Sequence, residues 1–318
     1  MKDIKNILIC GIGAVGSIYA DKIQTFAKDN LRVLVDEARM EKYTKNPVVF
    51  NGRELHFNYV LPQETDFKAD LIIIATKFSG LLDARNNIEN FVKDDTVILS
   101  LLNGVTSEEI LAEKYGEDKL LLSYFIGHSA IREGRNITHD DVNTIVFGDK
   151  NNSLTSENVK RVKEFFRKAR INFEIPIDMT YSLWLKYMLN VSANQSTAIL
   201  RMTFGEMLEN KKFMDFAVNV MKEVQAVAKA EGVKNTDDMI EKTVKHLQTM
   251  MPEGKTSMLQ DVEAGRKTEV DMFAGTMVKL GAKHNIPTPY NKILKELVEI
   301  IHEHQDIHNS FLQKIKTL

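Results

Sequence analysis

Three glycines near the start of the chain have the spacing of a phosphate-binding loop. Gly11-Ile12-Gly13-Ala14-Val15-Gly16 follows the apolar run "ILIC" and precedes a segment with a helical pattern. In such a turn the first glycine permits a tight bend, the second lets the backbone approach a pyrophosphate, and the third lets helix and strand pack closely. The following helix N-terminus offers N–H groups and a positive dipole. This stretch predicts a dinucleotide site.

A second set of residues is suited to the reduction of a ketone. Lys186, Asn190 and Asn194 are spaced by four, so one helical face would present all three. A ketone needs a hydride at carbon and a proton at oxygen, and an ammonium group can polarise the carbonyl and donate that proton. Asparagine amides can orient a carboxylate or hydroxyl without adding charge. Taken singly, each residue is also typical of an ordinary polar helix face.

A third set lies further along the chain. Ser257, Asp261 and Glu269 are spaced by four and eight residues, and we expect them on one face of a helix over 256–284. Ser257 can donate to a carboxylate, and Glu269 can hold a hydroxyl or steer the lysine. The alternative for Glu269, which follows Arg266 and Lys267, is a solvated run of charges.

The residues after the second apolar run bear on the choice of cofactor. Asp36 lies 20 residues after Gly16, where a carboxylate can bind a ribose and favour NAD over NADP. Arg39 and Lys42 follow closely and could hold a 2′-phosphate instead. Asp36 is equally suited to cap a helix, so the sequence leaves these alternatives open.

Strand and helix patterns alternate in the first half of the chain. The runs "NILIC", "LRVLVD", "DLIIIAT" and "DTVILSLLNG" predict buried strands, with helices over 14–28 and 81–91 between them. Asn51-Gly52 between short extended runs predicts a hairpin, and "LLSYFIG" and "NTIVFG" predict further strands. We therefore expect an α/β fold with an N-terminal Rossmann-type, doubly wound parallel sheet.

Strand signals stop after "INFEIPIDM", and helical patterns cover 180–200, 236–250, 256–284 and 289–306. This change predicts a dinucleotide-binding domain over 1–170 and an all-helical substrate domain over 171–318. Apolar positions in the C-terminal helices permit a homodimer.

Composition narrows the class of protein. The net charge of −2 over 318 residues argues against a nucleic-acid or membrane-surface partner. Cys10 is the single cysteine, which fits a reducing compartment, and we expect a cytoplasmic protein. No apolar run approaches the ~20 residues that span a bilayer. His302, His304 and His308 are more typical of an exposed helix face than of a metal site, so no metal is expected.

Four further stretches complete a family pattern. They are "ATK" ending at Lys77, "LLNGV" with Asn103, "WLKYMLNVSANQSTAI" and "TSMLQDVEAGRKTEVD". With the glycine loop, and in this order, they closely resemble the ketopantoate reductase family (2-dehydropantoate 2-reductases) over essentially the whole chain. The resemblance implies a Rossmann domain and a helical domain with the active site in the cleft between them. It also implies reduction of a 2-keto acid with a nicotinamide cofactor, usually NADPH.

The resemblance also assigns roles to positions. Lys186 matches the family's general acid. Glu269 matches the acidic residue of the family's active site, and it is expected to be both a catalytic and a cofactor-binding residue. Substrate-binding positions are matched by Asn103, Asn190, Asn194 and Ser257. Cofactor positions are matched by the glycine loop, Lys77, Asn103 and, in "HSAIREG", Ala130; Asp36 and Arg39 are added from their place after the second strand.

The function expected from these residues is reduction of 2-dehydropantoate (ketopantoate) to pantoate in pantothenate biosynthesis. The cofactor is NADP(H) by resemblance, with NAD(H) left open by Asp36. The sequence departs from the family at Gln195, where many members have proline, and at Phe204. One alternative is therefore an NADH-dependent D-2-hydroxyacid dehydrogenase for other branched or aromatic 2-keto acids. Another is a non-catalytic NAD(P)-binding redox sensor, against which Lys186 and Glu269 argue.

Overall fold

The computed structural model describes residues 2–127, 130–140 and 142–316 and divides into two compact units, Met1–Leu183 and Trp184–Leu318. The division falls inside helix α6 (Met179–Leu189), later than the boundary near 170 expected from the sequence. The reason is packing, because Met179 and Leu183 in the N-terminal half of α6 belong to the same apolar cluster as Tyr124 and Val146 of the sheet.

The first unit is built on an eight-stranded sheet of order β12-β11-β8-β7-β6-β1-β2-β5. Its strands are β1 (Ile7–Cys10), β2 (Leu31–Leu34), β5 (Tyr59–Val60), β6 (Leu71–Ile74), β7 (Val97–Ser100), β8 (Leu120–Gly127), β11 (Asn143–Gly148) and β12 (Phe173–Glu174). The run from β5 to β8 pairs in parallel, whereas β11 is antiparallel to β8. The order about β1 is that of a dinucleotide-binding sheet, so the expected fold class is confirmed.

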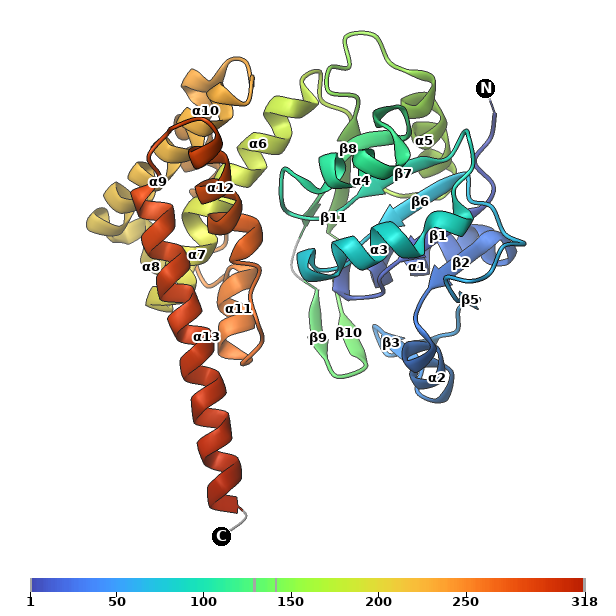
Figure 1. Cartoon of the computed structure of the whole chain (residues 1–318), viewed down its shortest axis with the longest axis horizontal. Helices are drawn as coiled ribbons and strands as arrows, with labels where there is room; N and C mark the ends of the chain where they lie inside the picture. The colour runs from blue at the N-terminus through green and yellow to red at the C-terminus, as the bar shows by residue number, and fades with distance from the viewer. Residues whose placement is uncertain (1, 128–129, 141, 317–318) are drawn as a thin grey trace. The chain divides into compact units, whose positions relative to one another are not determined.

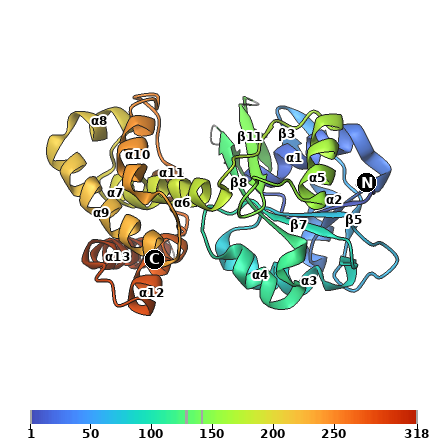
Figure 2. The same ribbon diagram turned by 90° about the horizontal axis from the view of Figure 1, so that it is seen from above.

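Helices cover both faces of this sheet. Figure 2 shows α3 and α4 on one face and α1 and α5 on the other. The helices of this unit are α1 (Ala14–Ala27), α2 (Glu37–Lys45), α3 (Leu81–Asn87), α4 (Ser107–Tyr115) and α5 (Glu157–Lys168). Strands covered on both faces must be apolar on both sides. All residues of β1, β6 and β7 are accordingly buried.

The predicted hairpin is confirmed. Strands β3 (Val48–Phe50) and β4 (Arg53–Leu55) pair antiparallel, and the turn between them has φ of 48° at Asn51 and 79° at Gly52. Two consecutive positive φ values are what a two-residue hairpin of this kind requires. With β9 (Ile131–Glu133) and β10 (Asn136–Thr138), these strands form a small second sheet.

The described part of the second unit is helical (Figure 1). After α6 come a π-helical turn, η5 (Asn190–Asn194), α7 (Gln195–Leu200), α8 (Phe204–Glu209), α9 (Lys211–Ala230), α10 (Met239–Leu247), α11 (Ser257–Glu263), a second π-helical turn, η7 (Asp271–Gly275), α12 (Thr276–Lys283) and α13 (Pro289–Lys316). The helix predicted over 180–200 is therefore present with a π turn in its middle, and α13 is longer than predicted. In the described part of the chain, no helix is long and apolar enough to cross a membrane.

The prediction of a single helix over 256–284 is wrong. Helix α11 ends at Glu263 because Gly265 adopts a left-handed φ of 65°. The Gly265 N–H then binds the Val262 carbonyl at 3.1 Å, and the Arg266 N–H binds the Asp261 carbonyl at 2.8 Å. This pair of bonds is the Schellman ending of a helix. Ser257 and Asp261 share α11, but Glu269 lies beyond its end, so the expected common face does not exist.

Candidate active site

The glycine loop follows β1 and owes its shape to the absence of side chains. A Cβ on Gly11, whose φ is 98°, would lie 2.8 Å from the Ala75 carbonyl oxygen, and one on Gly16 would lie 1.9 Å from that of Gly11. A Cβ on Gly13 would meet nothing within 4 Å. Gly11 and Gly16 are thus required by the protein's own packing, whereas Gly13 leaves open space beside the backbone.

That open space lies at the start of α1. Gly13 is the N-cap residue and provides no side-chain cap, so the first N–H groups of α1 are available to an anion. Thr76 Oγ1, just after β6, is buried without a hydrogen-bond partner among the described residues. These features fit a dinucleotide: the open side at Gly13 and the N–H groups of Ala14 and Val15 would hold its pyrophosphate.

The other candidate residues of this unit follow neighbouring parallel strands. Lys77 follows β6 and is exposed, while Asn103 follows β7 and is partly buried. Ala130 comes after β8, partly buried against the main apolar core; His128 and Ser129 of the same stretch lie outside the described residues. Ligands of open α/β sheets bind at the carboxyl ends of the strands, and all three positions follow such ends.

The loop that carries Asn103 is anchored by a buried polar network. Ser107 Oγ donates to Glu108 at 2.7 Å, Ser100 and Ser107 hydroxyls are 2.9 Å apart, and the Ser123 N–H donates to Glu108 at 3.2 Å. Desolvation raises the pKa of Glu108 to about 7, although these hydrogen bonds act in the opposite direction. The network joins the end of β7 to the start of α4.

Asp36 caps α2 and also pairs with Arg39. One carboxylate oxygen accepts the Arg39 N–H at 2.7 Å, and the other accepts Arg39 Nη1 at 2.5 Å. The capping role left open by the sequence is therefore present in the structure. Because Arg39 is in direct contact with Asp36, the negative charge at this position is locally balanced.

Lys186 lies in α6 and is partly buried. Desolvation lowers the pKa of its ammonium group from 10.5 to about 8. The pKa of His246 on α10 is lowered mainly by desolvation and, to a smaller extent, by the charge of Lys186. A lysine with this pKa is still largely protonated near neutral pH and is a stronger acid than a solvated lysine, which suits proton donation.

The π turn η5 changes how Lys186, Asn190 and Asn194 are displayed. In an α-helix of 3.6 residues per turn, each step of four residues overshoots a full turn by about 40°. The wider turn over Asn190–Asn194 reduces that overshoot in the second step, so Asn194 is rotated back towards the direction of Lys186. The predicted common face is present, but the π turn that aligns it was not predicted.

Side chains add hydrogen bonds to backbone carbonyls around the π turn. Ser192 Oγ donates to the Met188 carbonyl at 2.8 Å, and Thr197 Oγ1 donates to the Ala193 carbonyl at 2.8 Å. Asn194 Nδ2 reaches Ser257 Oγ, the first residue of α11, at 3.4 Å. The structure therefore brings together the buried Asn194 and the exposed Ser257.

Glu269 lies in the irregular segment between α11 and η7 and is partly buried. The preceding Thr268 N–H donates to His302 Nε2 at 3.1 Å. Burial lowers the pKa of His302, with a smaller effect of the Lys267 charge, which favours the neutral ring that this bond needs. The exposed face expected for the three histidines is thus wrong for His302, whereas His304 and His308 are exposed.

The sequence did not predict residues that matter through contacts with segments far away in the chain. Arg132 donates from Nη1 to the Ile12 carbonyl of the glycine loop at 3.0 Å, although 120 residues separate them. The π turns and the His302 contact likewise leave no periodic pattern in the sequence. Within the described ranges, no group of three or more His, Cys, Asp or Glu residues could hold a metal ion.

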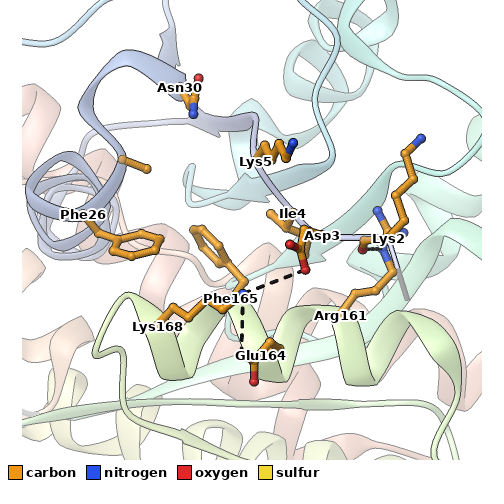
Figure 3. A pocket seen from close by; sticks show the side chains of 11 residues that line it. Lys2, Asp3, Ile4, Lys5, Phe26, Asn30, Arg161, Glu164, Phe165 and Lys168 are labelled. Carbon is orange, nitrogen blue, oxygen red and sulfur yellow. Dashed lines mark hydrogen bonds and ion pairs between the residues drawn. The ribbon is translucent and has the colours of Figure 1, made fainter.

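A pocket of about 240 Å³ lies elsewhere on the first unit (Figure 3). Its lining includes Lys5 just before β1 and Asn30 just before β2, so it lies at the amino ends of these strands, opposite the glycine loop. In Figure 3 the Lys168 ammonium lies between Asp3 and Glu164, at 3.9 and 3.5 Å. Its lining carries four basic side chains and two acidic ones, and it contains none of the candidate residues.

The sheet order, the glycine loop and the helical second unit define a two-unit dinucleotide-binding protein. Two family models match the chain: Ketopantoate reductase PanE/ApbA over residues 7–152, and Ketopantoate reductase PanE/ApbA C terminal over residues 178–302. The chain belongs to the ketopantoate reductase family, which confirms the resemblance seen in the sequence.

Individual relatives agree with this assignment. The 2-dehydropantoate 2-reductase of Aquifex aeolicus is 27% identical over 302 residues, covering 93% of this chain and 96% of that protein. That of Lactococcus lactis is 29% identical over 312 residues, covering 92% and 96%. A D-mandelate dehydrogenase solved with NADH has the same fold, with a TM-score of 0.83 at 22% identity over 94% of this chain and 99% of that one. A dimeric ketopantoate reductase from Staphylococcus aureus has a TM-score of 0.75 at 19% identity over 94% and 99%.

Proposed function

We propose that this protein is an NAD(P)H-dependent 2-dehydropantoate 2-reductase, an oxidoreductase that reduces ketopantoate to pantoate in pantothenate biosynthesis. Family membership across both units supports this reaction. The single observation that carries it is Lys186, a partly buried lysine with a pKa of about 8, placed one turn before the buried Asn190. We place the reaction in the cytoplasm, which suits the one buried thiol, Cys10.

The bound nicotinamide would supply the hydride to the keto carbon. Lys186, as an ammonium, polarises the keto oxygen and transfers a proton to it, giving the 2-hydroxy acid. The lysine is left neutral and takes a proton back from water. Asn190, Asn194 and Ser257 bind the carboxylate and hydroxyl groups of the keto acid, and Glu269 accepts a hydrogen bond from a substrate hydroxyl.

The preferred cofactor of this proposal is NADPH. Asp36 alone would repel a 2′-phosphate, but both of its carboxylate oxygens are engaged by Arg39. The arginine can turn its remaining N–H groups to a phosphate, because a guanidinium carries five donors. In this proposal, the residues of the first unit that contact the cofactor are those of the glycine loop, Lys77, Asn103 and Ala130.

Steady-state kinetics test this proposal. We would measure kcat/KM with NADPH and NADH against ketopantoate, 2-ketoisovalerate and phenylglyoxylate. A site that binds the extra hydroxyl of ketopantoate rejects analogues without it strongly, so we expect at least a ~10²-fold preference for ketopantoate, with NADPH. A preference for the simpler acids with NADH would instead identify a D-2-hydroxyacid dehydrogenase. Cofactor binding without any turnover would identify a non-catalytic sensor.

The protein is also proposed to form a homodimer. Ile293, Leu297, Ile300 and Ile307 on α13 are exposed, and their spacing of four, three and seven puts them on one face. The dimeric relative from Staphylococcus aureus supports a second copy as the partner. Sedimentation should give a dimer for the wild-type protein and a monomer for Ile300→Glu. A wild-type monomer would refute this part of the proposal.

A further inference from the structure

Both π turns of the second unit contain or adjoin candidate site residues. η5 contains Asn190 and Asn194, and η7 begins two residues after Glu269. A π turn interrupts the regular i→i−4 ladder, so some backbone groups must find other partners. In η7 the Phe273 N–H binds the Glu269 carbonyl and the Gly275 N–H binds the Val270 carbonyl. The Ala274 N–H between them is left to bond elsewhere.

The side chain of Gln195 forms hydrogen bonds with backbone groups of both turns. Gln195 Oε1 accepts the Ala274 N–H at 3.1 Å, and Gln195 Nε2 donates to the Val191 carbonyl of η5 at 3.0 Å. The Gln195 side chain has no exposed surface, so water cannot replace either bond. A neutral amide suits this place because it has an acceptor at one end and donors at the other.

Two other contacts show that η7 is held as a unit. Tyr187 of α6 donates from its hydroxyl to the carbonyls of Met272 and Phe273, at 3.1 and 2.8 Å. The Met272 and Phe273 N–H groups in turn bond the Glu269 carbonyl at 3.0 and 3.2 Å. A shift of η7 therefore moves the backbone of Glu269.

We infer that Gln195 is a positioning residue, which fixes the helix bearing Lys186, Asn190 and Asn194 to the segment bearing Glu269. The inference rests on the proposed function for the roles of these residues. Gln195 itself is fully buried, so its side chain is not accessible to substrate or cofactor; in this inference it acts through the backbone of the two turns. Without it, the amide of Ala274 and the carbonyl of Val191 lose their common partner, and the two turns can move apart.

The first test compares Gln195→Met with a matched control. Methionine fills a similar volume but makes neither hydrogen bond. Ser192→Ala removes another buried hydrogen bond of η5, to the Met188 carbonyl, without touching η7. We expect Gln195→Met to lower kcat/KM for ketopantoate roughly 10- to 100-fold, through kcat as well as KM. Ser192→Ala should stay within about threefold, and the cofactor Kd should be unchanged in both. Equal losses in the two variants would overturn the inference.

A second variant covers the case in which Gln195→Met does not fold. In Gln195→Glu, a protonated carboxyl can accept from Ala274 and donate to Val191, whereas the carboxylate cannot donate. Burial raises the pKa of such a carboxyl. The ratio of kcat/KM for Gln195→Glu to that of the wild type should therefore rise as the pH falls. A ratio that is independent of pH would contradict the positioning role.

Hydrogen exchange separates this inference from the proposed function. The Ala274 amide should exchange at least tenfold faster in Gln195→Met than in Ser192→Ala, whatever substrate the protein uses. Unchanged exchange at Ala274 would show that the Gln195 link is dispensable. Absence of wild-type turnover with ketopantoate, together with the faster exchange, would refute the proposed function and leave the structural link in place.

Discussion

The glycine loop of the first unit and the polar helices of the second differ in which of their atoms are proposed to bind ligands. In the loop, the backbone is the group proposed to bind the cofactor, and Gly11 and Gly16 are needed because a Cβ would lie too close to a carbonyl oxygen. In the helices the groups proposed to act on the keto acid are side chains, and contacts between distant residues hold these helices together. Asn194 and Ser257 are 63 residues apart, and Gln195 and Ala274 are 79 apart.

The difference indicates where each region is sensitive to change. A site made from backbone tolerates substitution at the residues around it but not at its glycines. A site made from side chains depends on helix geometry, and both π turns add a local irregularity that buried hydrogen bonds must support. We therefore expect loop variants to affect cofactor binding and helix variants to affect the keto acid and its reduction.

The largest expected effect is that of Lys186→Ala. Loss of a general acid should lower kcat by about 10²–10⁴-fold. The cofactor Kd should be unchanged, because the glycine loop does not depend on this side chain. Lys222→Ala, at an exposed lysine of α9, is the control and should retain wild-type kinetics. Turnover near the wild-type value in Lys186→Ala would mean that another group donates the proton.

Glu269→Gln should have the next largest effect. The two side chains have the same shape, so the Tm should be retained. A hydrogen bond to a charged group contributes about 1.5–3 kcal/mol, so kcat/KM for ketopantoate should fall roughly 10- to 100-fold. Glu263→Gln, which removes a surface ion pair with Lys255 of 2.8 Å, should be neutral. Equal kinetics for the two variants would assign Glu269 to the solvated run of charges.

Gly13→Ala tests the other side of the comparison. With a φ of −71° and open space around its Cβ, alanine should leave the Tm unchanged. The methyl group would occupy the approach to the pyrophosphate, so the cofactor Kd should weaken about tenfold, or ~1.4 kcal/mol. Gly16→Ala, by contrast, should destabilise the fold by roughly 1–3 kcal/mol through overpacking. Calorimetry and cofactor titration of both variants check this, and an unaltered Kd in Gly13→Ala would remove the loop from the binding site.

The smallest effect is expected at Gly265, which ends α11 before Glu269. Alanine at its φ of 65° should cost about 1–2 kcal/mol of stability. Gly232 ends α9 in the same way, with a φ of 87°, and Gly232→Ala should cost a similar amount. Only Gly265→Ala should also raise the KM for ketopantoate, by a few-fold, because it loosens the Glu269 segment. Identical KM values in the two variants would contradict that link.

Local patterns predicted the first unit well. Buried strands read as continuous apolar runs, Asn51-Gly52 specified its hairpin, and the three glycines specified the loop. The second unit was predicted as helical, but its irregularities were not. Gly265 carried a usable signal for the end of α11. The π turns did not, because they depend on contacts such as Gln195 with Ala274, which no local spacing reveals.

The same limit applies to the candidate site. Lys186, Asn190 and Asn194 could be predicted because they lie on one continuous helix. Glu269 was placed on the wrong element, and the contacts of Arg132 and His302 were missed, since each joins segments far apart in the chain. The sequence left capping and ribose binding open for Asp36, because its contact with Arg39 is seen only in the structure.

The pH dependence of kcat/KM for ketopantoate tests the central claim most directly. The pKa of Lys186 is lowered to about 8, so the lysine is protonated below that pH and neutral above it. A proton donor with this pKa predicts a plateau at lower pH and a fall approaching tenfold per pH unit above about pH 8, reporting the free enzyme. A profile that stays flat to pH 10 would contradict the assignment of Lys186 as the acid that completes the reduction.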